Sequence, residues 1–148
     1  MTFAVDMKAF AEKAKANGDI VMRNIMFGVG RRLVERSPVG DPTRWKSPPP
    51  KGYVGGRFRG NWQFNIGAAA SEETGRIDPS GTVTIETNIG EVPTTGLFGR
   101  VYYYSNNVPY ARALEDGHSG QAQPGFIVAD TVMHFQNIVN EAVAELPK

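Results

Sequence analysis

The stretch EDGHSGQ, residues 115–121, brings together side chains from which hydrolytic enzymes build their sites. A serine nucleophile of the Gly-x-Ser-x-Gly type needs a glycine on each side and a strand leading in. Gly117 stands two residues before Ser119, but Gln121 stands two residues after it, and His118 is its direct neighbour, which makes triad geometry hard to build. We interpret the stretch as a solvated polar turn; a hydrolase using Ser119 and His118 is a third alternative, and we expect no enzyme.

Metal and nucleotide sites lack their usual spacing in this chain. There is no cysteine, and His118 and His134 belong to no H-x-x-H or H-E-x-x-H motif. GVGRRL, residues 28–33, begins like a dinucleotide-binding loop but lacks the third glycine and lies inside a helical pattern. Glycines on a helix more often allow another backbone to pack closely. We expect no metal, no cofactor and no catalytic residue.

Basic and aromatic residues alternate in WKSPPPKGYVGGRFRGNWQ, residues 45–63. Such a mixture can bind the phosphates and bases of a nucleic acid. It is equally typical of protein interfaces, where Trp, Tyr and Arg are enriched. The candidate interface residues are Arg44, Trp45, Lys46, Lys51, Tyr53, Arg57 and Arg59, joined later in the chain by Tyr110, Glu115 and Asp116.

The charges are divided unevenly along the 148 residues. Residues 1–59 hold 12 Lys/Arg against 5 Asp/Glu, whereas residues 60–148 hold 4 against 10. The first part could bind a polyanion, or it could dock on the acidic part of another copy. We favour docking between copies, because a dedicated DNA binder usually has an overall basic excess, and here the net charge is +1.

Composition predicts one soluble domain, with 41% hydrophobic and 21% charged residues. No apolar run approaches the ~20 residues of a membrane span, so no membrane partner is expected. The N-terminus carries charges throughout and does not resemble a secretory signal. The lack of cysteine fits a cytoplasmic setting.

Helical spacing of apolar residues predicts a long helix over residues 3–36, with Gly18 as a point where it could bend or break. Ser37-Pro38 ends it. Residues 38–60 show no periodicity and are interpreted as an extended arm. If a strand began at Gly60, Trp62 would be core while Arg57, Arg59 and Asn61 would face outward.

Alternation then predicts a sheet within residues 61–105, with strands at GNWQFNIG, TVTIETNI and RVYYYSN. A loop at 106–125 with a short helical turn at YARALED precedes a helix at 126–146. The expected fold is a single α+β domain: a small antiparallel sheet of three to four strands, packed by a long N-terminal and a C-terminal helix, with a long Pro/Gly-rich loop.

The order of these motifs resembles the neck or tail-completion proteins of long-tailed, lambda-like bacteriophages, which join head to tail. The family pattern has Ser/Thr-Pro-Val, then Asp-Thr-Gly-Arg-Leu-Arg-Asn-Ser-Trp, then Asn-x-x-x-Tyr-Ala-x-x-x-Glu-x-Gly, then a proline-containing stretch. The resemblance covers residues 3–146, although GDPTRWKSPPPKGYVG is an insertion relative to the family. The matching positions are Ser37, Pro38, Val39, Gly56, Arg57, Phe58, Arg59, Gly60, Asn61, Trp62, Asn106, Tyr110, Ala111, Glu115, Gly117 and Pro124.

The resemblance implies a tail-terminator-like fold and a structural virion protein at the head–tail junction, assembled in the host cytoplasm. It implies a homo-oligomeric ring, hexameric or twelve-fold, around the DNA channel. Its partners would be other neck, portal-side adaptor and tail proteins, with DNA passing through the lumen non-specifically. The alternative is a small nucleic-acid-binding module that uses the basic residues of 44–59. In the first case the residues 38–60 act as an assembly arm, stiffened by three prolines.

Overall fold

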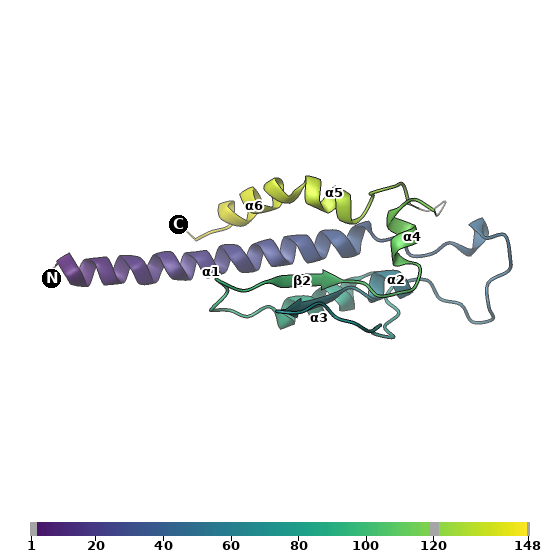
Figure 1. The fold of residues 1–148 in the computed structure, drawn as a ribbon, viewed down its shortest axis with the longest axis horizontal. Helices are drawn as coiled ribbons and strands as arrows, with labels where there is room; N and C mark the ends of the chain where they lie inside the picture. The colour runs from purple at the N-terminus through teal and green to yellow at the C-terminus, as the bar shows by residue number, and fades with distance from the viewer. Residues whose placement is uncertain (1–2, 119–121, 148) are drawn as a thin grey trace.

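The computed structural model describes residues 3–118 and 122–147, with side chains from residue 13 onward. Its central element is the helix α1, Phe3–Arg36. The helices α5 and α6 lie along one side of α1, while the strands and the helix α3 lie along the other (Figure 1). The segment after α1 projects beyond the C-terminal end of the helix, and the first turns of α1 extend past every other element (Figure 1). The result is an α+β fold with a long N-terminal helix.

Helix α1 runs without interruption through Gly18, although the sequence allows a bend or break there. The Phe98 ring packs on that glycine so closely that a Cβ there would lie 2.5 Å from the ring. Gly28 and Gly30 receive the side chains of Ile138 and Tyr104 in the same way. The GVG motif therefore lets side chains of other elements pack closely on the helix, whereas the sequence suggested the close approach of another backbone.

The sheet has two antiparallel strands within the described residues, β1 (Gln63–Ile66) and β2 (Tyr102–Ser105). Phe64 pairs with Tyr104 in the register, and their rings lie 5.2 Å apart. The Tyr104 hydroxyl donates to the Met26 carbonyl of α1 at 2.7 Å, which ties the sheet to the helix.

The predicted strand at residues 82–89 is wrong: this segment forms the helix α3, Thr82–Glu91. Asp78 starts the helix, because its carboxylate accepts hydrogen bonds from both the N–H and the hydroxyl of Thr84 at 2.8 and 2.7 Å. The buried positions Thr84 and Asn88 are one helical turn apart, whereas Val83 of the alternating pattern is exposed. The three to four strands expected are thus reduced to two among the described residues.

Asn88 of α3 occupies the edge of the sheet where another strand would pair. Its side-chain oxygen accepts from the Phe64 N–H at 3.3 Å, and its amide donates to the Trp62 carbonyl at 3.1 Å. One buried amide side chain thereby satisfies two main-chain groups at the start of β1, the Phe64 N–H and the Trp62 carbonyl.

The C-terminal helix predicted at 126–146 consists of two helices, α5 (Val128–Met133) and α6 (Phe135–Ala144). They meet at His134, whose φ of −93° and ψ of 5° leave the helical range. The remaining elements are short: a 3-10 turn at Pro42–Arg44, α2 at Arg57–Gly60 and α4 at Ala111–Glu115.

Two clusters of buried side chains form the core. The larger one joins the end of α1 to α2, the loop after β2 and the start of α5; its buried members are Leu33, Val34, Phe58, Trp62, Val108 and Ile127. The smaller one, beside the sheet, contains Phe64, Val92 and Leu97. Within the described residues, no helix is both long enough and apolar enough to cross a membrane.

Candidate functional site

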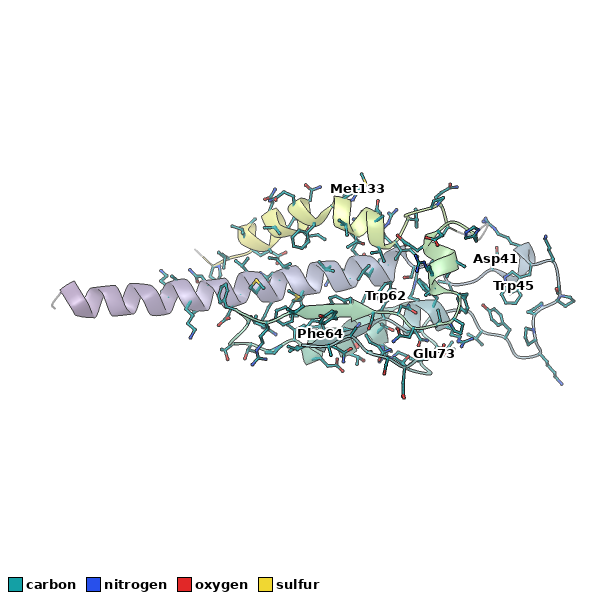
Figure 2. The ribbon with its side chains drawn as sticks, viewed as in Figure 1. Asp41, Trp45, Trp62, Phe64, Glu73 and Met133 are labelled. Carbon is teal, nitrogen blue, oxygen red and sulfur yellow. The ribbon has the colours of Figure 1, made fainter. Side chains whose placement is uncertain are left out.

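The C-terminal end of α1 is the point where the distant sequence motifs meet. Ser37 follows the helix; its hydroxyl donates to the Leu33 carbonyl at 2.6 Å and accepts from the Trp62 indole N–H at 2.7 Å. Trp62 is buried, as the alternation suggested (Figure 2). The Ser-Pro-Val and Gly-Asn-Trp segments are therefore held together by one buried hydrogen bond.

Arg59 caps α1 rather than facing outward. Its guanidinium donates to the carbonyls of Ser37 at 2.7 Å, Glu35 at 3.3 Å and Pro79 at 2.8 Å. The last carbonyls of a helix have no partner within the helix and carry its negative dipole end, so a cation here satisfies both needs. The expectation that Arg59 and Asn61 point away from the core is wrong, because α2 replaces the strand that would have turned them outward. Asn61 is fully buried.

The short helix α2 positions this arginine through two glycines. Gly56 has a φ of +109°, and a Cβ there would collide with the backbone of Pro79. At Gly60 a Cβ would lie 2.5 Å from the Arg76 carbonyl oxygen. The segment 74–79 therefore passes directly over α2, and only glycine fits at both motif positions.

Asn106 and Asn61 complete this junction. The Asn106 amide donates to the Phe58 carbonyl at 2.7 Å, and Asn61 bridges the Arg57 carbonyl and the Thr74 N–H. Sequence reasoning matched both residues to the family pattern but assigned them no bonding role. It missed Asp78 and Asn88, whose roles depend on the helix that was interpreted as a strand.

Glu115 is not a solvated residue of an exposed turn. Its carboxylate accepts hydrogen bonds from the N–H groups of Ile127, Val128 and Ala129 at 3.3, 3.0 and 2.9 Å, which caps α5. The neighbouring Asp116 is exposed and lies 3.8 Å from Arg112 in an i,i+4 ion pair. The two acidic candidates thus have different environments, one structural and one on the surface.

Gly117 has a φ of +80°, and a Cβ there would lie 2.5 Å from the Pro124 ring. The glycine and the proline of the last motif therefore pack on each other. His118 is exposed, while Ser119 and Gln121 lie outside the described residues. Across residues 3–118 and 122–147, no three potential metal ligands gather.

The aromatic candidates gather around an open groove of about 350 Å³ at the base of the arm, residues 38–60. The Trp45 and Tyr53 rings meet edge to face, 4.7 Å between centroids. Tyr110 lies across the groove, 6.4 Å from the Phe58 ring. The lining residues are Pro38, Val39, Gly40, Trp45, Tyr53, Arg57, Phe58, Tyr110 and Leu114.

Electrostatics in this groove are governed by Arg57. The guanidinium pairs with Glu73 at 2.7 Å and lies 5.7 Å from the centre of the Tyr110 ring. Burial raises the pKa of the Tyr110 hydroxyl, and the Arg57 charge only partly offsets this effect. Tyr110 is therefore a neutral hydroxyl at physiological pH, on a largely apolar wall.

The basic candidates farther out on the arm lie near its end. Lys46 and Lys51 are exposed, and Arg44 lies 3.5 Å from Asp41. The side-chain and backbone hydrogen bonds of Thr43 hold the pKa of Asp41 below its usual value, so Asp41 is a charged cap of the 3-10 turn. Figure 2 shows Trp45 and Asp41 on this projecting segment.

Some of the basic charges of residues 1–59 are neutralised by an acidic residue of the same chain. Asp130 of α5 binds both Arg32 at 2.5 Å and Arg36 at 2.8 Å, and Arg36 also lies 3.8 Å from the centre of the Phe126 ring. The hydrogen bond from Arg32 is the largest cause that lowers the pKa of Asp130.

No protein-family model matches the chain, and no curated protein or solved structure is significantly similar to it.

Proposed function

We propose that this protein is a structural component of a bacteriophage neck, a ring former at the head–tail junction, as the resemblance implies. The observation that carries the proposal is the spatial convergence of the motif positions. Ser37, Arg59, Trp62, Asn106 and Glu115 belong to three distant motifs, yet they form one joint between α1, α2 and α5. This convergence at one junction is what supports the proposal.

The same joint gives the arm a rigid base, which suits a role in assembly. The Gly56 N–H donates to the Val39 carbonyl at 2.7 Å, so the two ends of the arm are fastened to each other. Beyond that bond, residues 42–54 contribute no buried side chain. A long segment that the core does not use, and that presents Trp45 and Tyr53, is typical of a binding element.

A nucleic-acid-binding module is the second candidate function, and the arrangement of its arginines disfavours it. Arg59 is held by three carbonyls and Arg57 by Glu73, which leaves few of the proposed phosphate ligands for a backbone. A Lys46→Ala, Lys51→Ala variant tests it. If DNA is the ligand, the slope of log affinity against log salt should fall by about 2.

The test of the neck role is deletion of the gene in the phage that encodes it. We expect separate filled heads and finished tails in negative-stain micrographs, and joined particles when the intact protein is supplied from a plasmid. Joined, infectious particles from the deletion phage would overturn the proposal. Loss of heads or tails themselves would also overturn it, because that result places the protein earlier in assembly.

A further inference from the structure

An apolar groove of about 510 Å³ runs along α1 between the strand β2 and the helices α5 and α6. Its floor is a stripe of α1 side chains at helical spacing, among them Met22, Met26 and Val29. Tyr102 of β2 lines one wall, and Val132 of α5 lines the other. Val132 is 68% exposed, so the groove is open to a partner. An exposed apolar surface of this kind marks a site of interaction with another chain.

The helical wall of the groove is apolar along its length. Val128, Val132 and Phe135 line it at steps of four and three residues. Met133, the next residue after Val132, does not line the groove; it is 82% exposed and faces away from α1 (Figure 2). Among the described residues that line the groove, Arg100 is the one with a charge. The occupant must therefore present a mainly apolar side, because an unpaired charge is costly to bury there.

The first turns of α1 form a helical overhang, defined as residues 3–16, that passes beyond every other element (Figure 1). Residues 13–16, at its end, are all exposed. In the sequence, Phe3, Met7 and Phe10 follow one another at steps of four and three residues, so these positions share one side of the helix. A helix of this length is only marginally stable in water unless it packs on a partner.

The overhang and the groove match in length and in character. At the usual rise per residue, residues 3–16 span about 20 Å, and the groove floor from Met22 to Leu33 spans about 17 Å. An amphipathic helix that lays its apolar side in an apolar groove is a common mode of recognition between chains. One chain cannot make this contact with itself, because the overhang and the groove floor belong to the same uninterrupted helix.

We therefore infer that the overhang of one copy docks in the groove of a second copy, with the side that carries Phe3, Met7 and Phe10 towards the α1 floor. The contact joins two different surfaces, so it can repeat from copy to copy and close into a ring at a suitable rotation. The inference rests on the proposed function, since it supplies the contact between copies that a ring requires.

Sedimentation velocity of the full chain tests the contact, with two neighbouring residues of α5 as a matched pair. Val132→Glu places a carboxylate in the groove and should weaken self-association about tenfold or more. Met133→Glu places the same charge on the side of α5 that faces away from α1 and should leave self-association unchanged. Both side chains are largely exposed, so both variants should fold. Equal effects of the two changes, or a wild-type chain that stays monomeric, would overturn the inference.

Mixing two variants identifies the segment that fills the groove. Phe10→Glu damages the overhang and leaves the groove intact, whereas Val132→Glu does the reverse. Each variant alone should be mainly monomeric, and the mixture should form one-to-one complexes that grow no further, because one intact pair of surfaces remains between them. Phe3→Glu is a second overhang variant with the same expectation. Variants that stay apart on mixing would overturn the inference, since another segment would then fill the groove.

The outcomes separate this inference from the proposed function. If the Val132→Glu protein assembles like the Met133→Glu protein and both still join heads to tails, the neck role stands and the contact is lost. If the two variants form their one-to-one complex while the deletion phage still yields joined particles, the contact stands and the neck role is lost.

Discussion

The indole N–H of Trp62 donates to the Ser37 hydroxyl at 2.7 Å, and that hydroxyl donates in turn to the Leu33 carbonyl at 2.6 Å. The serine hydroxyl thus links the buried indole to the last turn of α1 through two hydrogen bonds. Both residues are almost fully buried, so neither can replace the lost bond with water.

We expect the two side chains to be energetically coupled. Ser37→Ala leaves the indole N–H unsatisfied and should cost about 1–3 kcal/mol of unfolding free energy. In the Trp62→Phe background the same change should cost clearly less, with a coupling energy of about 0.5–3 kcal/mol. Urea unfolding of the wild type, the two single variants and the double variant measures this coupling, and additive effects would contradict it.

Trp62→Ala removes a buried aromatic side chain and should lower the unfolding free energy by about 3–5 kcal/mol.

Alanine substitutions at two helical glycines should change the free energy of unfolding in opposite directions. At Gly30 the new methyl group would collide with the Tyr104 hydroxyl, so Gly30→Ala should destabilise by about 1–3 kcal/mol. At Gly90 of α3 an added Cβ would have no neighbouring atom within 4 Å, so Gly90→Ala should stabilise by about 0.5–1 kcal/mol. Thermal unfolding measures both, and a shift of equal sign would refute the packing role of the GVG motif.

Glu115 and Asp116 form a matched pair for testing the cap of α5. Glu115→Ala removes the acceptor of three N–H groups and should lower the unfolding free energy by about 1–2 kcal/mol. Asp116→Ala loses only an exposed ion pair and should change it by less than about 0.5 kcal/mol. Similar losses in the two variants would mean that the cap contributes nothing.

Stability should fall in acid partly through Asp78. Burial raises the pKa of this carboxyl, but hydrogen bonds from Thr84, Ser80 and Gly81 outweigh burial and leave the pKa below its usual value. Because the folded pKa lies below the unfolded one of about 3.9, the stabilisation is present above that value. It is lost as the pH falls through the folded pKa. Asp78→Asn should make the unfolding free energy less dependent on pH below about 4; an unchanged slope would contradict this.

The arm should be dispensable for folding. Deletion of residues 42–54, with a short glycine linker in their place, leaves the bond between Gly56 and Val39 intact and removes no buried side chain. The unfolding free energy should change by about 1 kcal/mol or less, since loop length affects closure entropy only weakly. The folded product should fail to restore infectivity to a phage lacking the gene. An unfolded product would place the arm in the core, and infectious particles would exclude it from assembly.

Helix α1 was predicted well because Ile25, Val29 and Leu33 recur at helical spacing and pack in the core. The strand β2 also lies where sequence predicted it, although all four of its residues are half-buried and show no alternation. Residues 82–89 were misjudged because Val83, Ile85 and Ile89 alternate like a strand, while Asp78 and Asn88 act through bonds to distant residues that no local pattern reveals.

The residues of the candidate site also fall into two groups, one that sequence predicted and one that it did not. Trp45, Tyr53, Arg57 and Tyr110 are brought together as residue types favoured in interfaces, whereas Arg59 and Glu115 have capping roles. A lone arginine or glutamate gives no sign in sequence of whether it will meet solvent or a helix end. Only the tertiary structure decides this.

The packing of α6 on α1 joins segments that are far apart in the chain. The Asn24 amide donates to the Ala142 carbonyl at 3.3 Å across a separation of 118 residues, and Ile138 fills the space above Gly28. At a synthesis rate of about 5–20 residues per second, on the order of ten seconds therefore pass between the synthesis of α1 and the synthesis of α6, which covers it. Throughout that interval its glycine-bearing apolar side is open to chaperones and to other nascent chains. A chain that ends before α6 lacks the helix that covers this side of α1.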